Sequence, residues 1–259
     1  MKKPYYYIGS LEKATKILEL LAEFSELSVS EIARKLGMYR SAAHRFLATL
    51  KTLGFLDQSE NSNYKLSFKL FELGIKATNR LEVRQIIHPF LVDLRTRHEE
   101  TANLGIVDGV DVIYLDKVES THLLRMDLAI GCRVPSYCTA LGKAILANRG
   151  ESEIEGLFRG VKLERRTPKT VKNLTALLGH LREIRKQGYA IDNEENYTGI
   201  RCLAVPIFNY TGKCIGAISI AGPTVRMTYE KIEKMKLDLI SIGKTISLKL
   251  GNVTNTAAI

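Results

Sequence analysis

Residues 28–56 carry the signals of two helices joined by a tight turn, and no other stretch constrains the fold of the chain as closely. Ser28 followed by Glu31 fits a capping box, in which a hydroxyl closes a helix start and a carboxylate three residues later reaches back to the backbone. Gly37 fits a chain reversal after this first, short helix. A second helix is expected from Arg40 to Leu53. Two helices connected in this way predict a helix-turn-helix.

An amphipathic helix precedes this motif and a short hairpin follows it. After Gly54, two short strands at residues 55–58 and 64–67 flank a polar turn rich in Asn and Ser. Three helices and a hairpin make a winged helix-turn-helix, which we place at residues 1–67. The first helix is expected over residues 11–24, with its apolar stripe at Leu11, Ala14, Ile17, Leu18 and Leu21.

The second helix of the motif begins with polar side chains and becomes apolar further along, with Ala43, Phe46, Leu47 and Leu50 expected to face inward. In a helix-turn-helix this helix enters the major groove of DNA by its N-terminal turn, so that turn must be polar. Arg side chains can neutralise phosphates or bind guanine, and hydroxyl and imidazole groups can bond to phosphates or base edges. We predict DNA contacts from Tyr39, Arg40, Ser41, Ala42, His44 and Arg45, and from Lys65 in the wing.

The charge of the chain agrees with a polyanionic partner. The formal net charge is +10 and the sequence pI is about 9.4. Residues 1–80 hold 13 Lys and Arg against 8 Asp and Glu, whereas residues 81–259 hold 25 against 20, so the basic density is greatest at the front. Two alternative interpretations are a basic surface that is simply solvated and a winged helix that binds another protein.

Two further observations concern compartment and metal. No apolar run approaches the roughly 20 residues of a membrane-spanning helix, and the start MKKPYYYIGS lacks the apolar core of a signal peptide. We therefore expect a cytoplasmic protein without membrane contact. No CxxC pair or zinc-like spacing occurs, so we expect buried thiols and no metal site at Cys132, Cys138, Cys202 and Cys214.

The remaining chain predicts a connecting helix at residues 68–81 and a second domain at residues 82–259. The second domain should be one antiparallel sheet with flanking helices, which makes the fold class α+β. Its strongest turn signal is Asp108-Gly109 between two strands. Other strands are expected near residues 123–130, 201–209 and 213–221, and helices at residues 82–98, 139–147, 174–188 and from Tyr229 onward.

Three stretches of this second domain offer groups for a small-molecule pocket. Thr139 can cap a helix whose start at Ala140 would favour an anion such as a carboxylate. Asp192, Cys202 and Ser219 would supply acceptors and donors for a polyhydroxylated ligand if they face one cavity. The alternative is an ordinary capped helix and a core cysteine.

Catalysis is the competing interpretation of the same residues. A Cys nucleophile needs a base and an orienting group, and the histidines available after residue 80 lie in no recognisable catalytic motif; they are His88, His98, His122 and His180. TALGKAIL lacks the four-residue loop and second glycine of a phosphate-binding loop. We therefore predict no enzyme activity and no cofactor, and keep as an alternative a small-acid-processing enzyme domain fused to a DNA-binding module.

The order of helix-turn-helix, wing, linker helix, TALGKAILA, GYAIDNEENYTGIRCLAVPIF and AISIAGP resembles the IclR family of bacterial transcription regulators, from about Ser10 to Leu250. The resemblance implies a GAF-like effector domain and a homodimer or dimer of dimers on palindromic operators. Most members repress and some activate. It also implies that a small organic acid lies over the helix start at Ala140 and Leu141, in contact with Val134, Asp192, Cys202, Ser219 and Ala221.

At this last position the family often has Ser, so Ala221 removes one hydroxyl partner. Within the family, residues 123–147 look most like regulators of sugar-acid catabolism, such as those that answer 2-keto-3-deoxygluconate. The resemblance therefore implies a sequence-specific DNA-binding regulator, a repressor of a catabolic operon, controlled by a sugar acid or a 2-keto acid.

Overall fold

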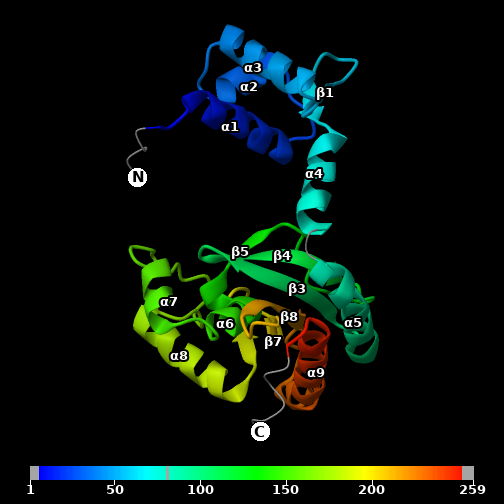
Figure 1. The fold of residues 1–259 in the computed structure, drawn as a ribbon, viewed down its shortest axis with the longest axis vertical. Helices are drawn as coiled ribbons and strands as arrows, with labels where there is room; N and C mark the ends of the chain where they lie inside the picture. Colours follow the sequence, from blue (N-terminus) through cyan, green and yellow to red (C-terminus); the bar gives the residue numbers. More distant parts are fainter. Residues whose placement is uncertain (1–5, 80–81, 253–259) are drawn as a thin grey trace. The chain divides into compact units, whose positions relative to one another are not determined.

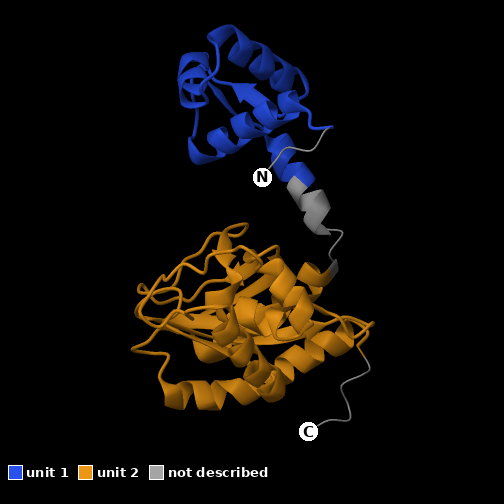
Figure 2. Ribbon diagram, turned by 90° about the vertical axis from the view of Figure 1, so that its left-hand side faces the viewer, with its two compact units in different colours: residues 1–81 blue, residues 82–259 orange. Residues whose placement is uncertain are grey.

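The computed structural model describes residues 6–79 and 82–252, and the chain divides into two compact units, residues 1–81 and 82–259 (Figures 1 and 2). Each unit has its own apolar core.

The first unit is a winged helix-turn-helix, as predicted. The capping box is present: the Ser28 side chain accepts from the backbone N–H of Glu31 at 3.3 Å, and the Glu31 carboxylate accepts from the N–H of Ser28 at 2.9 Å. Gly37 takes a φ of +62°, the left-handed conformation that the turn requires. The elements are α1 Gly9–Glu23, α2 Val29–Lys35, α3 Arg40–Thr52, β1 Leu56–Gln58, β2 Tyr64–Leu66 and α4 Phe68–Asn79.

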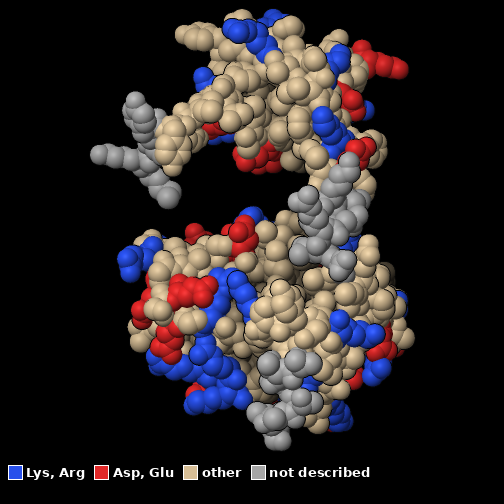
Figure 3. All heavy atoms as spheres, viewed as in Figure 1, with Lys and Arg blue, Asp and Glu red and all other residues tan. Residues whose placement is uncertain are grey.

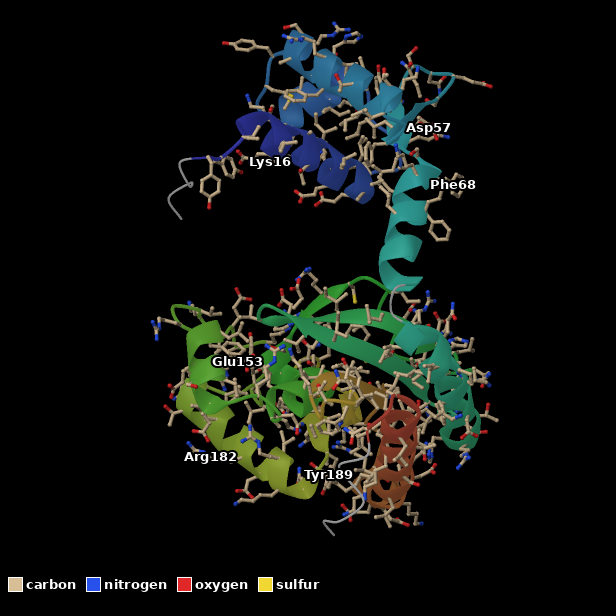
Figure 4. All side chains as sticks on the ribbon, viewed as in Figure 1. Lys16, Asp57, Phe68, Glu153, Arg182 and Tyr189 are labelled. Atoms are coloured by element: carbon tan, nitrogen blue, oxygen red, sulfur yellow. The ribbon has the colours of Figure 1, made fainter. Side chains whose placement is uncertain are left out.

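The core of this unit is built from the apolar faces of its three helices and the hairpin, and it includes Ile17, Ile32, Leu47 and Leu56. The prediction that Leu11 joins this core is wrong, because its side chain is 63% exposed. Helical spacing determines the face on which a residue lies, but not how far the neighbouring elements extend along the helix. Residues 80–81, the last two of the predicted linker, lie outside the described residues. On α4 the labelled Phe68 ring projects from the helix and is 80% exposed (Figure 4).

The second unit contains a six-stranded antiparallel sheet in the order β5-β4-β3-β8-β7-β6. Helices cover both faces of this sheet, so the α+β prediction is confirmed. The strands are β3 Thr101–Asp108, β4 Asp111–Val118, β5 Arg133–Pro135, β6 Ala190–Asn193, β7 Ile200–Phe208 and β8 Cys214–Pro223. The helices are α5 Glu82–His98, α6 Ala140–Leu146, α7 Glu151–Leu157, α8 Leu174–Gln187 and α9 Tyr229–Lys249, with a short 3₁₀ turn η1 at Ser136–Cys138.

The two faces of the sheet have different partners. One face packs against α5 and α9 through large side chains such as Leu104, Leu203 and Ile220. The other face carries small residues such as Ala204 and Ala217 and packs against α6, with α7 and α8 contributing to the same core. The α6 face therefore carries the smaller strand side chains of the two.

The expected strand near residues 123–130 is absent, although the Asp108-Gly109 hairpin is present as predicted. The free edge of β4 is paired instead with β5, through Asp111–Ile113. β5 covers β4 only over these three residues, and carbonyl groups of the expected strand accept from side chains: that of Leu124 from Arg226 at 2.7 Å and that of Met126 from Thr101 at 3.4 Å. The segment 123–130 therefore runs without strand pairing, with Leu123 98% exposed and Met126 buried.

Within the described residues, no helix combines the length and the apolar character needed to cross a membrane.

Candidate functional site

The N-terminal turn of α3 presents its polar side chains to solvent. Tyr39 is 86% exposed, and Arg40, Ser41, His44 and Arg45 are also exposed, whereas Ala43, Leu47 and Leu50 are buried. Ala42 is half-buried between the two sets. The division between a polar leading turn and an apolar inner face is therefore present as predicted.

The cations of this surface are free of acidic partners. Arg40, Arg45 and the exposed Lys65 of β2 form no ion pair within the described residues. Figure 3 shows Lys and Arg side chains at the end of the first unit where α2 and α3 lie. Unpaired surface cations can neutralise phosphates without first breaking a salt bridge, which suits a nucleic-acid surface.

The strand register of the second unit places three predicted effector residues in one row. Asp192 on β6 is opposite Cys202 on β7, which is opposite Ala221 on β8. The row continues to Thr101 on β3. Directly opposed residues project from the same face of a sheet, so these side chains share one surface. Sequence reasoning missed Thr101, because the pairing of β3 with β8 joins segments far apart in the chain.

A second row runs parallel to the first, two residues along the strands. Ser219 on β8 is opposite Ala204 on β7 and Asn103 on β3. The Asn103 amide donates to the Ser219 hydroxyl at 3.4 Å. Because strand side chains alternate between faces, this row lies on the same face as Asp192. The structure thus brings Asp192, Cys202, Ser219 and Ala221 together, and it adds the unpredicted Asn103.

The helix α6 covers this face. The Thr139 hydroxyl accepts from the N–H of Gly142 at 3.2 Å, which is the predicted cap. Ala140, Leu141 and Val134 belong to the same apolar core as Cys202. The helix start is buried, with Ala140 and Leu141 each 1% exposed.

Asp192 is the central polar group of the site. Its carboxylate accepts from the backbone N–H of Glu195 at 2.7 Å and is 3% exposed. Burial raises the pKa of Asp192 to about 7, although the positive charge of Lys143 and backbone N–H donors act in the opposite direction. At neutral pH this carboxyl group exists in both the protonated and the ionised form.

A buried ion pair stands beside Asp192. The ammonium group of Lys143, on α6, contacts a carboxylate oxygen of Glu195 and donates to the carbonyl of Ile191 at 2.7 Å. The Glu195 carbonyl accepts in turn from the Thr170 hydroxyl at 2.6 Å. These bonds connect α6, β6 and the turn that follows β6.

The thiols of the site are poorly suited to nucleophilic catalysis. Burial raises the pKa of Cys202 well above its ordinary value and that of Cys138 to about 12, so both remain protonated. His88 and His98 pair with Asp116 and Asp238, each at 2.8 Å, and belong to α5. No cluster of three metal-ligating side chains occurs among the described residues.

A cavity of about 550 Å³ lies elsewhere in the second unit, between α8, β7 and α9. Its walls include Arg185, Val205 and Lys244 and none of the predicted effector residues. The predicted effector site is a closed interior face, and this cavity is separate from it.

Comparison with known families agrees with both units. The family profile of the IclR helix-turn-helix domain matches residues 10–60, and that of the bacterial transcriptional regulator IclR C-terminal domain matches residues 75–248. The chain belongs to the IclR family.

Individual relatives share most of the chain with it. The HTH-type transcriptional regulator KdgR of Escherichia coli is 37% identical over 245 residues, which are 94% of this chain and 93% of the relative. The crystal structure of Thermotoga maritima IclR is 39% identical and covers 95% of this chain and 100% of its own, with a TM-score of 0.80. An IclR homolog of Microbacterium hydrocarbonoxydans, solved in complex with 4-hydroxybenzoate, shares the fold at 22% identity and a TM-score of 0.80, covering 93% of this chain and 99% of its own.

Proposed function

We propose that this protein is a repressor of a catabolic operon that binds a palindromic operator through α3 and releases it in response to a small organic acid. The effector would be a sugar acid or a 2-keto acid. The protein would work in the cytoplasm as a homodimer or dimer of dimers, with residues 1–67 as the DNA-binding domain, 68–81 as the linker and 82–259 as the effector domain.

The observation that carries the effector site is the row of Asp192, Cys202 and Ala221, with Ser219 beside it. All four side chains lie on the small-residue face beneath α6, and each is at most 6% exposed. An interior face with a few convergent polar groups among apolar neighbours is the usual composition of a small-molecule site. Val134, Ala140 and Leu141 would supply its apolar wall.

For DNA, the supporting observation is the exposed polar turn of α3, whose Arg40 and Arg45 have no ion-pair partner in the described part of the chain. Tyr39, Ser41 and His44 would contact phosphates or base edges, Ala42 would allow close approach, and Lys65 would contact the backbone from the wing. The relative KdgR is itself named a transcriptional regulator of the helix-turn-helix type.

Regulation requires that the acid bind the DNA-competent and DNA-incompetent arrangements with different affinities. The helix α4 lies between the wing and the second unit in the sequence, so it would transmit the difference. The enzyme alternative has less support, because the buried thiols stay protonated and the family's relatives are regulators.

The experiment that tests this proposal is operator binding measured with and without a panel of aldonic, 2-keto-3-deoxy and simple 2-keto acids. One class of acid should change the operator Kd and raise the thermal stability of the protein, since a ligand of the folded state stabilises it. Asp192→Ala should lose this response and keep its operator affinity. The acid should be recovered chemically unchanged; turnover would favour the enzyme alternative, and a chain lacking residues 82–259 that still responds would refute the effector assignment.

A further inference from the structure

Two buried polar atoms beside Asp192 have no hydrogen-bond partner in the part of the chain that the structure describes. They are Oε2 of Glu195 and Nδ2 of Asn196. Glu195 is 8% exposed and Asn196 is 3% exposed, so bulk water does not compensate either atom. Buried polar groups are almost always paired, because an unpaired one costs free energy. A neighbouring orphan acceptor and orphan donor therefore point to a partner that is not part of the protein.

The orphan acceptor is held in place from three sides. The backbone N–H of Glu195 donates to Asp192 at 2.7 Å, and its carbonyl accepts from Thr170 at 2.6 Å. Its other carboxylate oxygen, Oε1, is taken by the ammonium group of Lys143. Oε2 is the atom of Glu195 that is left without a hydrogen bond, and the bonds around it fix its position.

The orphan donor belongs to a side chain whose oxygen lies near a thiol. The Cys138 Sγ lies 3.8 Å from Oδ1 of Asn196. Because burial raises the pKa of Cys138 to about 12, the thiol keeps its single proton, and its two acceptors are this oxygen and the carbonyl of Pro135 at 3.6 Å. The amide nitrogen Nδ2 is then the free end of the side chain, with N–H groups to donate.

The chemistry of this pair selects among ligands. Oε2 of Glu195 can accept only from a group that donates, such as a hydroxyl, and Nδ2 of Asn196 can donate to a hydroxyl oxygen. A carboxylate or keto oxygen can only accept, and a carboxylate would also be repelled by Glu195. We propose that Glu195 and Asn196 bind a hydroxyl group of the effector, so that the site selects a polyhydroxy acid over a simple 2-keto acid. This inference rests on the proposed function of the site and narrows its ligand class.

The test compares acids that share a head group but differ in hydroxyl groups. Pyruvate carries the 2-keto carboxylate of 2-keto-3-deoxygluconate without its hydroxyl-bearing carbons, and D-gluconate supplies a hydroxylated acid without the keto group. Calorimetric titration of the full chain should show 2-keto-3-deoxygluconate or D-gluconate binding at least about tenfold more tightly than pyruvate, because a site built for a hydroxyl rejects the analogue that lacks it.

The decisive variant is Asn196→Leu, which replaces the amide by an apolar group of similar size. We expect it to reduce the preference for the hydroxylated acids to less than about threefold, with pyruvate affinity unchanged. Its thermal midpoint without ligand should be equal to or above that of the parent protein, since an orphan polar atom is removed. Asn193→Leu, three residues earlier at the end of β6 and bonded to Tyr229 and Arg201, is the matched control and should keep the preference.

The outcomes separate this inference from the proposed function. If Asn196→Leu leaves every affinity unchanged, as a buried water bridging the pair would predict, the inference is wrong and the effector site stands. The same holds if pyruvate binds as tightly as the hydroxylated acids. If no acid binds at all, the proposed function fails and the inference fails with it. Should Asn196→Leu not fold, Glu195→Gln provides the second variant, with the same expected loss of preference.

Discussion

Asp192 on β6 lies directly opposite Cys202 on β7, and both side chains face the interior beneath α6. A carboxyl group and a thiol are thus placed in register on adjacent strands, within an otherwise apolar core. Ionisation of either group is unfavourable here, because burial raises the pKa of Asp192 and that of Cys202. The consequence for Asp192 falls in the physiological pH range.

The first prediction concerns the pH dependence of stability. The pKa of Asp192 is about 7 in the folded protein, against an ordinary 3.8. Between these two values the folded state holds a proton that the unfolded state has released, so the free energy of unfolding should fall as pH rises, by about 1.4 kcal/mol per pH unit from this group. Denaturant titrations of the parent and of Asp192→Asn at pH 5, 6, 7 and 8 would measure it.

In Asp192→Asn this contribution should disappear, so the difference in unfolding free energy between variant and parent should shift in favour of the variant as pH rises. Asp111→Asn, on the same sheet but half-exposed, serves as the control and should follow the parent. Parallel pH profiles for Asp192→Asn and the parent would show that the Asp192 carboxyl is ionised throughout.

Features that depend on a few neighbouring residues could be predicted from the sequence. The Ser28–Glu31 capping box, the left-handed Gly37 and the Thr139 cap are each determined within about four residues, and all three are present. The strand predicted at residues 123–130 is wrong because its formation does not depend on neighbouring residues alone. Its apolar pattern suits a strand, but its backbone bonds depend on residues far away in the chain, and the side chains of Thr101 and Arg226 bond to its carbonyl groups.

The candidate site divides in the same way. The co-facial position of Asp192, Cys202 and Ser219 was expected as a condition for a pocket, and the register meets it. Thr101 and Asn103 could not be assigned to the site, because β3 reaches it only by pairing with β8, more than a hundred residues away. Glu195 and Asn196 lie in the motif GYAIDNEENYTGIRCLAVPIF at residues 188–208. Which of their polar atoms lack a partner, however, depends on how Lys143 and Cys138 pack against them.

A second prediction tests the placement of α3. Arg45→Ala should weaken operator binding, because the exposed guanidinium has no acidic partner among the residues that the structure describes. Loss of base readout, roughly 1–3 kcal/mol, would be specific to the operator, whereas loss of a phosphate contact would weaken all DNA about equally and reduce the salt slope by about one. Fluorescence anisotropy with operator and unrelated duplexes at several salt concentrations distinguishes a lost base contact from a lost phosphate contact.

Lys13→Ala, which removes an exposed cation from α1, provides the control for that experiment and should leave operator binding close to the parent value. Unchanged affinity of Arg45→Ala for both duplexes would remove this residue from the groove.

A third prediction concerns the start of α2. Ser28→Ala removes the hydroxyl that accepts from the N–H of Glu31 and also donates to its carboxylate at 2.7 Å. Losing an N-cap of this kind typically costs about 1 kcal/mol of unfolding free energy. Urea denaturation of the first unit should show this loss, whereas Ser30→Ala, an exposed serine inside the same helix turn, should be nearly neutral. Equal stability of the two variants would argue against the cap.

The last prediction concerns how closely α6 approaches the turn before it. A Cβ added to Gly142 would lie 2.2 Å from the carbonyl oxygen of Ser136, which is far inside contact distance and involves backbone on both sides. Because neither segment can move without disturbing the Thr139 cap, Gly142→Ala should destabilise the second unit by about 3 kcal/mol. Gly179→Ala in α8 meets nothing within 4 Å and should stabilise by roughly 0.5–1 kcal/mol, since alanine favours a helix interior. Thermal unfolding of both variants measures the contrast. Equal midpoints would mean that α6 does not pack against η1 as closely as Gly142 and Ser136 indicate, and the closed face over Asp192 would then have to be reconsidered.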